Sequence, residues 1–423
     1  MTDFSGKRVT VVGLARSGQA AAKLLKQLGA RVKVSDQGQP NAFPSEFLQW
    51  LSQEGVGKEF GGHSKEFILD SDLVIISPGV HVDALPLQWA REQAIPVWSE
   101  IELAAQLCLC PIIAVTGSNG KTTTVTLISE ILKAAGKNVR LCGNVGTPFS
   151  QYVLELKPQD YVVLEISSFQ LETIVTFRPK VAVLINFSQN HLDRHRDLDE
   201  YFNAKCRIFM NQGADDFAVL NAGDEKVCSL QKKLKSQVFF FNYPGHAAEE
   251  QITNPNYLAA AQVARILGIP REIYQKVFAE FRGVEHRLEK VRTLDGIEYI
   301  NDSKATTVES GRWALENLER PVIMICGGED KKLDYVSLRD LVHRKVKHMV
   351  VIGKIRQQLA ETFGSVVPVT DGGTEFRQAI ERARSFAQQG DCVLLSPMTS
   401  SFDMFKNYEE RGRIFKEIVG QLS

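Results

Sequence analysis

The chain has 423 residues, more than one hydrophobic core normally supports, so its length predicts two or three domains. Apolar residues make up 44% of the sequence and charged residues 24%, which is typical of a globular protein. Fifty Lys and Arg balance fifty Asp and Glu, which excludes the broad cationic surface of a protein that binds nucleic acid or anionic membranes. We therefore expect small-molecule ligands, held locally, and a monomer.

The cysteines and the N-terminus indicate the cellular compartment. The seven cysteines are odd in number and lie mostly in or beside apolar runs, which predicts buried free thiols in a reducing cytosol. Cys108 and Cys110 have no second Cys or His pair nearby, so they do not predict a zinc site. "MTDFSGKRVT" lacks the apolar core of a signal peptide, and no apolar run reaches the length of a membrane span. We expect a cytoplasmic protein.

Short apolar runs that end in Gly, Ser, Asp or Asn alternate with segments of helical periodicity along most of the chain. This rhythm predicts an α/β protein with largely parallel sheets and crossover helices, whose ligands lie beyond the carboxyl ends of the strands. The pattern restarts near Pro96–Glu100 and near Gly283–Arg287. Three such domains are predicted, at 1–98, 99–284 and 285–423. The last should open with a β-hairpin that turns at Asp295-Gly296.

The first domain begins "VTVVGLARSGQAAAKLLKQLGARVKVSD", a Rossmann-like order of strand, glycine turn, helix and strand. Ala15 replaces the middle glycine of the dinucleotide fingerprint G-x-G-x-x-G. Two interpretations remain open. Gly13 and Gly18 could serve only a tight turn and close packing, or the helix N-terminus could bind a nucleotide diphosphate. From this stretch alone a dehydrogenase is also possible.

The central domain carries "PIIAVTGSNGKTTT", in which a buried strand and a helix flank the turn "TGSNGKTT". Gly117 and Gly120 allow backbone N–H groups to point at phosphate oxygens. Lys121 can reach the β- and γ-phosphates, and the hydroxyl of Thr122 or Thr123 can bind Mg²⁺. The glycine spacing is tighter than in the usual P-loop. A solvated lysine on a Gly/Ser turn is the alternative, but the strand, loop, Lys-Thr pair and helix coincide.

Three further residues follow strands or face inward in the central domain. Glu165 ends the run "YVVLE", where a carboxylate could reach a metal beside the loop, although an ordinary strand-end glutamate is the alternative. In "LDEYFNAKCRIFMNQ" one helical face would carry Phe202, Lys205 and Phe209. An inward lysine needs a partner or a change of charge, unless it snorkels to solvent. His191 follows the run "VAVLINFSQN".

The spacing of "TGSNGKTT" resembles the ATP-binding loop of the Mur ligases, the ATP-dependent amino-acid ligases of peptidoglycan and cell-wall synthesis. The resemblance covers nearly the whole chain, and "NDSKAT" and the final stretch look like the members that add D-glutamate to UDP-N-acetylmuramoyl-L-alanine. The motifs that carry it are "SPGV" (77–80), "GNVG" (143–146), "EISSFQLE" (165–172), "NHLDRH" (190–195), "EHRLE" (285–289), "NDSKAT" (301–306), "GGEDK" (327–331) and "SPMTSSFDMFKNYEERG" (396–412).

The resemblance implies ATP, two Mg²⁺ sites and an acyl-phosphate intermediate. Lysine and magnesium would neutralise charge on the transferred oxygens. The resemblance further implies that Lys205 is carbamylated and helps to hold the second Mg²⁺. The implied metal ligands are Thr122, Glu165, His191 and Lys205, and the implied catalytic residues are Lys121, Glu165, His191, Lys205 and Lys304. The implied ATP contacts are Gly117, Ser118, Asn119, Gly120, Lys121, Thr122, Thr123, Asn256, Arg287 and Asp302.

The two other substrates are assigned in the same way. Cations and hydroxyls near strand ends suit D-glutamate, whose two carboxylates must be bound while its amine stays reactive. Implied D-glutamate contacts are Lys304, Thr306, Lys331, Ser401, Phe402 and Tyr408. Implied contacts of the uridine nucleotide are Arg16, Ser17, Asp36, Gly79, Asn144, Ser167, Gln170 and His191. For Arg287, a surface pair with Glu285 or Glu289 is the alternative.

Other functions explain only part of the sequence. A nicotinamide dehydrogenase would use "GLARSG" but leave the Lys-Thr loop unexplained. A P-loop kinase or a non-catalytic nucleotide switch would leave the first domain unexplained. The nearest alternatives are a sister Mur ligase for another amino acid and a folylpolyglutamate-type ligase.

Overall fold

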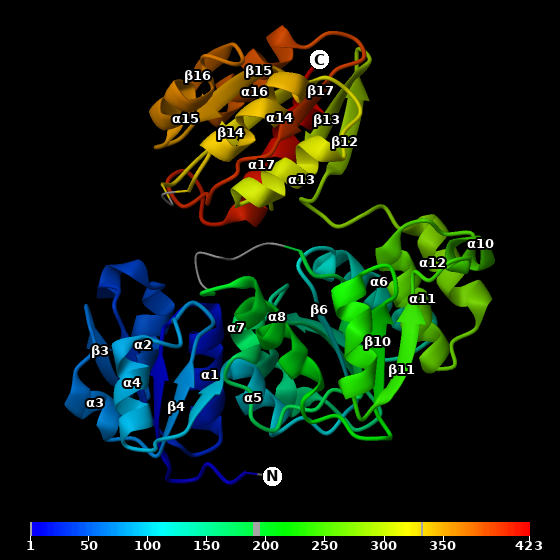
Figure 1. The fold of residues 1–423 in the computed structure, drawn as a ribbon. Coiled ribbons are helices and arrows are strands. Elements are labelled where there is room, and N and C mark those ends of the chain that lie inside the picture. Colours follow the sequence, from blue (N-terminus) through cyan, green and yellow to red (C-terminus); the bar gives the residue numbers. More distant parts are fainter. Residues whose placement is uncertain (1, 189–194, 331–332) are drawn as a thin grey trace. The chain divides into compact units, whose positions relative to one another are not determined.

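The computed structural model describes residues 2–188, 195–330 and 333–423, and its chain divides into two compact units, Met1–Phe281 and Arg282–Ser423 (Figure 1). The first unit contains two parallel sheets and the second contains one sheet with a single antiparallel pair. The predicted α/β class with largely parallel sheets is confirmed. The predicted limits between domains stay predictions, and the first two sheets share one compact unit.

The first sheet is parallel in the order β3-β2-β1-β4-β5. Its strands are β1 (Arg8–Val12), β2 (Arg31–Asp36), β3 (Gly57–Phe60), β4 (Leu73–Ile76) and β5 (Val97–Ser99). The helices of this part are α1 (Arg16–Gln27), α2 (Ser45–Gln53), α3 (Lys65–Leu69), α4 (Leu85–Glu92) and α5 (Glu100–Ala105).

The central sheet is parallel in the order β11-β10-β9-β6-β8-β7. Its strands are β6 (Ile112–Thr116), β7 (Val139–Gly143), β8 (Tyr161–Glu165), β9 (Val181–Leu184), β10 (Phe217–Asn221) and β11 (Gln237–Phe241). The helices are α6 (Lys121–Ala134), α7 (Ser168–Leu171), α8 (Leu198–Cys206), α9 (Glu225–Cys228), α10 (His246–Glu250), α11 (Pro255–Ile266) and α12 (Arg271–Glu280). Figure 1 shows α6 and α11 on one side of this sheet and α5, α7 and α8 on the other.

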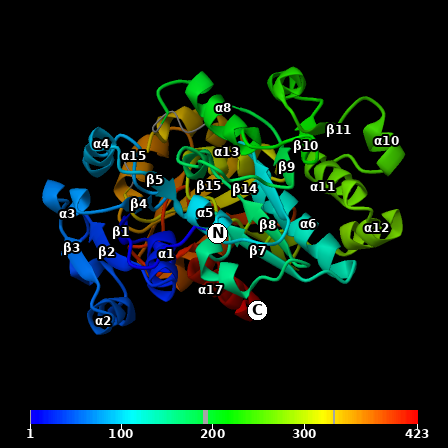
Figure 2. The same ribbon diagram turned by 90° about the horizontal axis from the view of Figure 1, so that it is seen from below.

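Side-chain alternation along the central strands explains the two covered faces. Ile113 and Val115 pack into the core beneath α6 and α11, whereas Ile112 and Ala114 point to the opposite core. Because successive strand residues face opposite sides, a strand covered on both faces is largely apolar, as β6 is up to its last residue, Thr116. The opposite core continues into the first sheet, and α1 and α5 lie between the two sheets in Figures 1 and 2. This shared core makes the first 281 residues one unit.

The third sheet has the order β12-β13-β17-β14-β15-β16. Its strands are β12 (Glu289–Leu294), β13 (Ile297–Asn301), β14 (Val322–Gly327), β15 (Val346–Ile352), β16 (Val369–Gly373) and β17 (Cys392–Leu395). The helices are α13 (Val308–Glu316), α14 (Arg339–Lys345), α15 (Arg356–Phe363), α16 (Phe376–Phe386) and α17 (Tyr408–Gln421). The predicted hairpin is confirmed, because β12 and β13 are antiparallel and Asp295 (φ 53°) and Gly296 (φ 74°) form its turn.

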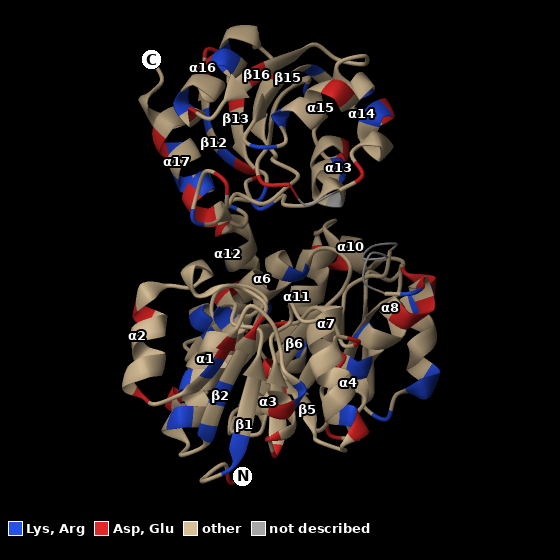
Figure 3. Ribbon diagram, turned by 90° about the vertical axis from the view of Figure 1, so that its left-hand side faces the viewer, with Lys and Arg blue, Asp and Glu red and all other residues tan. Residues whose placement is uncertain are grey.

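Short 3-10 helices lie at Pro40–Ala42, Phe149–Gln151, Val153–Glu155, Arg207–Phe209, Ser229–Lys233 and Val336–Leu338. In the part of the chain that the structure describes, no helix combines the length and the apolar character that crossing a membrane requires. Figure 3 shows basic and acidic residues interspersed along the helices of each unit. All seven cysteines are free thiols, as predicted, although Cys108, Cys206 and Cys228 are only half-buried.

Candidate active site

The predicted phosphate loop lies between β6 and α6. Gly120 has a left-handed conformation (φ 80°) at the N-cap of α6, and a Cβ there would overlap the side chain of Asn256. Lys121 Nζ donates hydrogen bonds to the carbonyl oxygens of Gly117 (2.9 Å) and Ser118 (3.0 Å), so the side chain folds back over the loop. The first turn of α6 adds backbone N–H groups and the positive end of the helix dipole. This arrangement suits a phosphate group.

A residue that the sequence analysis did not single out holds the loop in place. Asn186, two residues beyond the end of β9, accepts a hydrogen bond from the Asn119 N–H at its Oδ1 (2.9 Å) and from the Ser118 N–H at its carbonyl (3.1 Å). Ser118 Oγ in turn donates to the carbonyl of Ser188 (3.1 Å). The signal for Asn186 was present in the sequence, since a polar residue ends the apolar run "VAVLIN".

Glu165 ends β8, which pairs with β6 in a register that sets Glu165 opposite Val115. Its side chain is 2% exposed, and Oε1 accepts a hydrogen bond from Asn144 Nδ2 (2.7 Å). Among the described residues, its Oε2 has no hydrogen-bond partner. A buried carboxylate oxygen without a donor fits a cation, because leaving it unpaired is costly. The buried Thr122 hydroxyl supplies a second oxygen on the first turn of α6.

Lys205 lies on the inward face of α8, as the periodicity predicted, and is 1% exposed. Its Nζ donates a hydrogen bond to the carbonyl of Gly117 (2.9 Å) and lies 4.5 Å from the ring centroid of Tyr201. Burial, together with a smaller effect from the positive charge of Lys121, lowers the pKa of Lys205 well below its usual value. The site therefore favours an uncharged amine, which is the reactive form.

Other predicted residues of the first unit surround this centre. Asn256 lies in the first turn of α11, and its Oδ1 accepts a hydrogen bond from the hydroxyl of Thr124 (3.4 Å), so it adjoins the loop. Ser167 and Gln170 form a capping box at the start of α7, with Gln170 Oε1 accepting from the Ser167 N–H (3.0 Å). The half-buried Thr123 follows Thr122 on α6. Predicted His191 falls outside the described residues.

The predicted nucleotide contacts of the first sheet lie at its carboxyl edge. Arg16 is exposed and opens α1, Ser17 follows it, and Gly79 is exposed beyond β4. Asp36 already has two backbone partners, because it accepts hydrogen bonds from the N–H groups of Leu14 (2.5 Å) and Gly38 (2.7 Å). These contacts give Asp36 a structural role in the turn.

The glycine turn between β1 and α1 also has the packing function that the sequence analysis considered for Gly13 and Gly18. A Cβ on Gly18 would overlap the carbonyl oxygen of Gly13, so the helix packs against the turn as closely as glycine allows.

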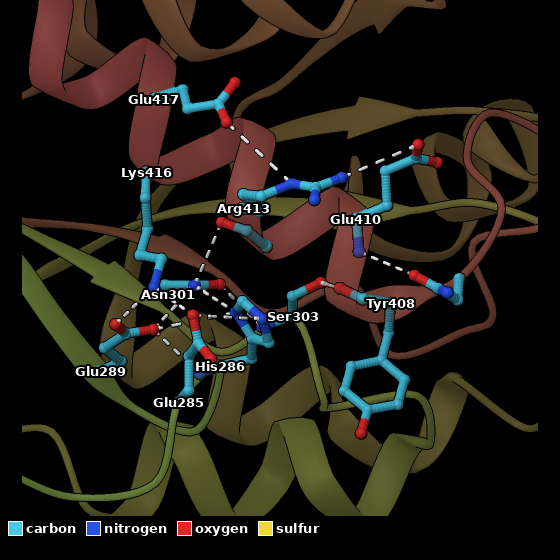
Figure 4. A network of polar contacts seen from close by, with 12 residues as sticks. Glu285, His286, Glu289, Asn301, Ser303, Tyr408, Glu410, Arg413, Lys416 and Glu417 are labelled. Atoms are coloured by element: carbon cyan, nitrogen blue, oxygen red, sulfur yellow. Dashed lines mark hydrogen bonds and ion pairs between the residues drawn. The ribbon is translucent and has the colours of Figure 1, made fainter. Parts of the chain in front are cut away.

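The second unit holds the remaining predicted residues. Glu285 and Glu289 both form ion pairs with Lys416, at 2.5 Å and 3.0 Å (Figure 4). The guanidinium of Arg287 lies 5.6 Å from the ring centroid of Trp313. Arg287 is thus oriented by an aromatic face, which leaves its charge available to an anion. Trp313 was not singled out by the sequence analysis.

Asp302 is buried behind Arg287 and accepts hydrogen bonds from the Leu288 N–H (3.2 Å) and from Ser396 Oγ (3.0 Å). Burial raises the pKa of Asp302 to about 7, although these hydrogen bonds and the charge of Arg287 act in the opposite direction.

A network of polar contacts links Tyr408, one of the residues predicted for D-glutamate, to Ser303 and the segment of His286 (Figure 4). The carbonyl of His286 accepts a hydrogen bond from the Lys304 N–H (3.0 Å), and its ring meets Tyr408 edge to face. Lys304 Nζ lies 5.9 Å from the Tyr408 ring centroid. Arg411 Nε donates to Ser303 Oγ (3.0 Å), which itself donates to the Tyr408 carbonyl (2.8 Å). Lys304 and Tyr408 are therefore neighbours.

The other residues predicted for D-glutamate are less clearly defined. Thr306 is half-buried two residues beyond Lys304, Ser401 is 2% exposed, and Phe402 is 70% exposed. Predicted Lys331 falls outside the described residues. The sequence analysis missed His286 and Arg411 as supports, although both lie inside motifs that it quoted.

Taken together, the strand–glycine turn–helix with its lysine, beside a buried carboxylate, defines a nucleotide-binding α/β protein. Three family models match the chain: "Mur ligase MurD-like, N-terminal domain" at residues 7–99, "Mur ligase middle domain" at 115–283 and "Mur ligase, glutamate ligase domain" at 286–398. The chain belongs to the Mur ligase family.

Full-length relatives and solved structures agree with this family. Proteins named UDP-N-acetylmuramoylalanine--D-glutamate ligase from Pelotomaculum thermopropionicum and Oleidesulfovibrio alaskensis are 41% and 42% identical. These matches cover 99% and 98% of this chain and 98% and 94% of the relatives. The crystal structure of UDP-N-acetylmuramate-alanine ligase MurC from Thermotoga maritima has a similar fold, with a TM-score of 0.58 at 19% identity, covering 98% of this chain and 99% of that one.

The raised pKa of Asp302 predicts how the stability of the second unit depends on pH. The folded-state pKa of about 7 lies above the ordinary 3.8, so the native state keeps this proton longer than the unfolded state does. Its contribution is complete below about pH 4 and is lost as the pH rises through 7. The shift in the pKa of Asp302 corresponds to a change of at most about 4 kcal/mol in the free energy of unfolding. Urea unfolding without nucleotide, from pH 4.5 to 7.5, measures this decline.

Asp302→Asn should flatten that pH profile, since its amide oxygen can still accept from the Leu288 N–H and its NH₂ group can donate to Ser396 Oγ. Asp371→Asn is the matched control, because Asp371 is an exposed partner of Arg356 in the same unit. An Asp302→Asn protein with the wild-type slope would contradict the assignment.

Proposed function

We propose that the chain is an ATP-dependent ligase that adds D-glutamate to UDP-N-acetylmuramoyl-L-alanine and releases ADP and phosphate, in peptidoglycan precursor synthesis. The substrate carboxylate attacks the γ-phosphorus of ATP, the bond to ADP breaks, and an acyl phosphate forms. The amine of D-glutamate then attacks the acyl carbon, phosphate leaves and the amine loses a proton. The main support is the convergence of Lys121, Glu165 and Lys205 at one edge of the central sheet, in a chain about 40% identical to relatives of that name.

The residues of the first unit would bind and orient the reacting phosphates. The N–H groups of Gly117–Gly120 and the ammonium of Lys121 would hold the phosphate chain of ATP, because Lys121 already reaches over the loop. Arg16, Ser17, Asp36 and Gly79 would hold the uridine nucleotide at the carboxyl edge of the first sheet. Asn144, Ser167 and Gln170 would hold the end of the substrate that bears the carboxylate.

When bound, Mg²⁺ would neutralise charge on the transferred phosphate oxygens. We propose two sites, held by Thr122, Glu165, His191 and carbamylated Lys205. The unpaired Oε2 of Glu165 supports a cation there.

In the first unit, Asn256 would contact the adenine of ATP. In the second unit, Arg287 and Asp302 would provide further contacts with ATP. Lys304, Thr306, Lys331, Ser401, Phe402 and Tyr408 would bind D-glutamate. The network that sets Lys304 beside Tyr408 supports this set, since carboxylates need cations and donors held in fixed positions.

We also propose that the enzyme is a monomer in the cytoplasm. The balanced charge of the sequence supports a small-molecule enzyme without a nucleic-acid partner. Light scattering at micromolar protein measures the mass, and a value twice 47.2 kDa would reject the monomer.

An amino-acid panel tests the reaction. With ATP, Mg²⁺ and UDP-N-acetylmuramoyl-L-alanine, phosphate release should require D-glutamate and should be absent with other amino acids. Lys121→Ala and Lys304→Ala should each lower kcat/KM by at least about 100-fold, because each removes a cation from a developing or bound anion. Lys347→Ala is a control on the surface of the second unit, where Lys347 pairs with Asp391. Turnover with another amino acid would instead favour a sister ligase, and release that ignores D-glutamate would reject a ligase.

Carbamylation of Lys205 is testable by itself. The amine attacks the carbon of CO₂, a C–N bond forms, and one proton passes to solvent, which leaves a carboxylate. The lowered pKa of Lys205 supports this step, because only the uncharged amine can attack. We expect ¹³C-bicarbonate to give a carbamate NMR signal in the wild type that Lys205→Arg lacks.

Lys205→Ala should lose at least about 100-fold in kcat, with partial recovery when short carboxylates are added. Lys226→Ala, which removes a half-buried lysine paired with Asp199, should keep both the signal and the activity. A carbamate signal that persists in Lys205→Arg would show that another lysine carries it.

A further inference from the structure

The helix that carries two proposed substrate contacts is too short to hold its own orientation. α7 has four residues, and Ser167 and Gln170 are its N-cap and third residue. A single helical turn gains too few hydrogen bonds to be stable alone, so tertiary contacts must fix it. The structure supplies such contacts through His195, which is 3% exposed.

His195 contacts both ends of α7. Its Nε2 forms a hydrogen bond with the hydroxyl of Ser168, the first helical residue (3.0 Å). Its Nδ1 lies 3.6 Å from Oε1 of Glu172, the residue that caps the other end. The ring also stacks on Phe169, with centroids 5.5 Å apart. One imidazole therefore spans the whole turn on one side.

The ring of His195 also contacts α8, through Tyr201. The His195 and Tyr201 rings have centroids 5.1 Å apart. The hydroxyl of Tyr201 lies 3.3 Å from Ser118 Oγ in the loop, and Lys205 Nζ lies over the Tyr201 ring. His195 thus joins the helix of the proposed substrate contacts to the element that backs the nucleotide loop.

A Ser-His-carboxylate arrangement could also suggest a nucleophilic serine. Burial argues against that function here, because Ser168 is 1% exposed and no substrate carbon could reach its hydroxyl. What the three side chains can do in this position is orient α7.

We propose that His195 is a positioning residue that orients α7, and through it Ser167 and Gln170, toward the nucleotide-sugar substrate. This inference rests on the proposed function, since it takes UDP-N-acetylmuramoyl-L-alanine as the ligand of those two residues.

His195→Phe keeps an aromatic ring of similar shape but loses both polar contacts. We expect it to raise KM for UDP-N-acetylmuramoyl-L-alanine about tenfold and to leave KM for ATP and for D-glutamate within about twofold, because a buried hydrogen bond contributes roughly that factor. His195→Gln, whose amide can still bond to Ser168, should recover most of the loss. The matched control is His348→Phe in the second unit, where a stacked imidazole bonds to the Thr370 hydroxyl (2.8 Å). It should leave all three KM values unchanged.

A double-mutant cycle with Ser168→Ala tests whether the two side chains act as one unit. If they do, the double variant should bind substrate no more weakly than the worse single variant. Additive losses would overturn the inference. A lower melting temperature of His195→Phe with every KM unchanged would also overturn the inference, because it would indicate a purely structural role.

Calorimetric binding of the same nucleotide sugar separates this inference from the proposed reaction. A Kd about tenfold weaker for His195→Phe supports the positioning role even if the wild type shows no turnover with D-glutamate, which would reject only the reaction. An unchanged Kd and KM beside normal wild-type turnover would reject only the positioning role.

Discussion

Two lysines from different helices donate to the carbonyl oxygen of one residue, Gly117, and the site of the first unit is organised around that contact. Lys205 is buried and Lys121 half-buried, so two positive charges here would repel each other with little screening by water. The protein meets this cost with loop carbonyls and by lowering the pKa of Lys205. Two lysine nitrogens therefore lie at the loop, and the carboxylate of Glu165 lies at the end of the neighbouring strand. Among the described residues, no donor bonds to Oε2 of Glu165. Phosphate and a divalent cation would balance such a centre together.

The parallel sheet explains why these groups meet. The carboxyl ends of β6, β8 and β9 lie together because the strands are hydrogen-bonded in register, with Val115 opposite Glu165 and Thr116 opposite Leu184. Each strand is largely apolar, and polar residues lie at its carboxyl end or within two residues of it, as Thr116, Glu165 and Asn186 do. Residues separated by about 70 positions, such as Ser118 and Ser188, therefore come within hydrogen-bonding distance. The same geometry binds ligands in other parallel α/β proteins.

The second unit holds cationic and aromatic side chains in fixed positions by a network of hydrogen bonds. Arg411, 1% exposed, links the segments of Ser303 and Thr399 by hydrogen bonds, and burial lowers its pKa to about 9. His286 connects the turn of Arg287 to Lys304 through its carbonyl. Hydrogen bonds of this kind rigidify the segments that they join, although Arg411 Nη1 has no hydrogen-bond partner among the described residues. The exposed Phe402 lies outside this rigid frame.

The sequence by itself determined the α/β class, the hairpin at Asp295-Gly296 and the order of strand, turn and helix around Lys121. Its periodicity also set Lys205 on one helical face with Phe202 and Phe209. These features depend on local periods and on turn chemistry, which a few consecutive residues specify. Only the tertiary structure decided that Asn186 holds the loop and that His195 spans α7. It also decided that Arg287 lies against Trp313 while the neighbouring glutamates pair with Lys416. Each of these contacts joins segments far apart in the chain. Their geometry follows from strand order and helix packing, which no local pattern in the sequence encodes.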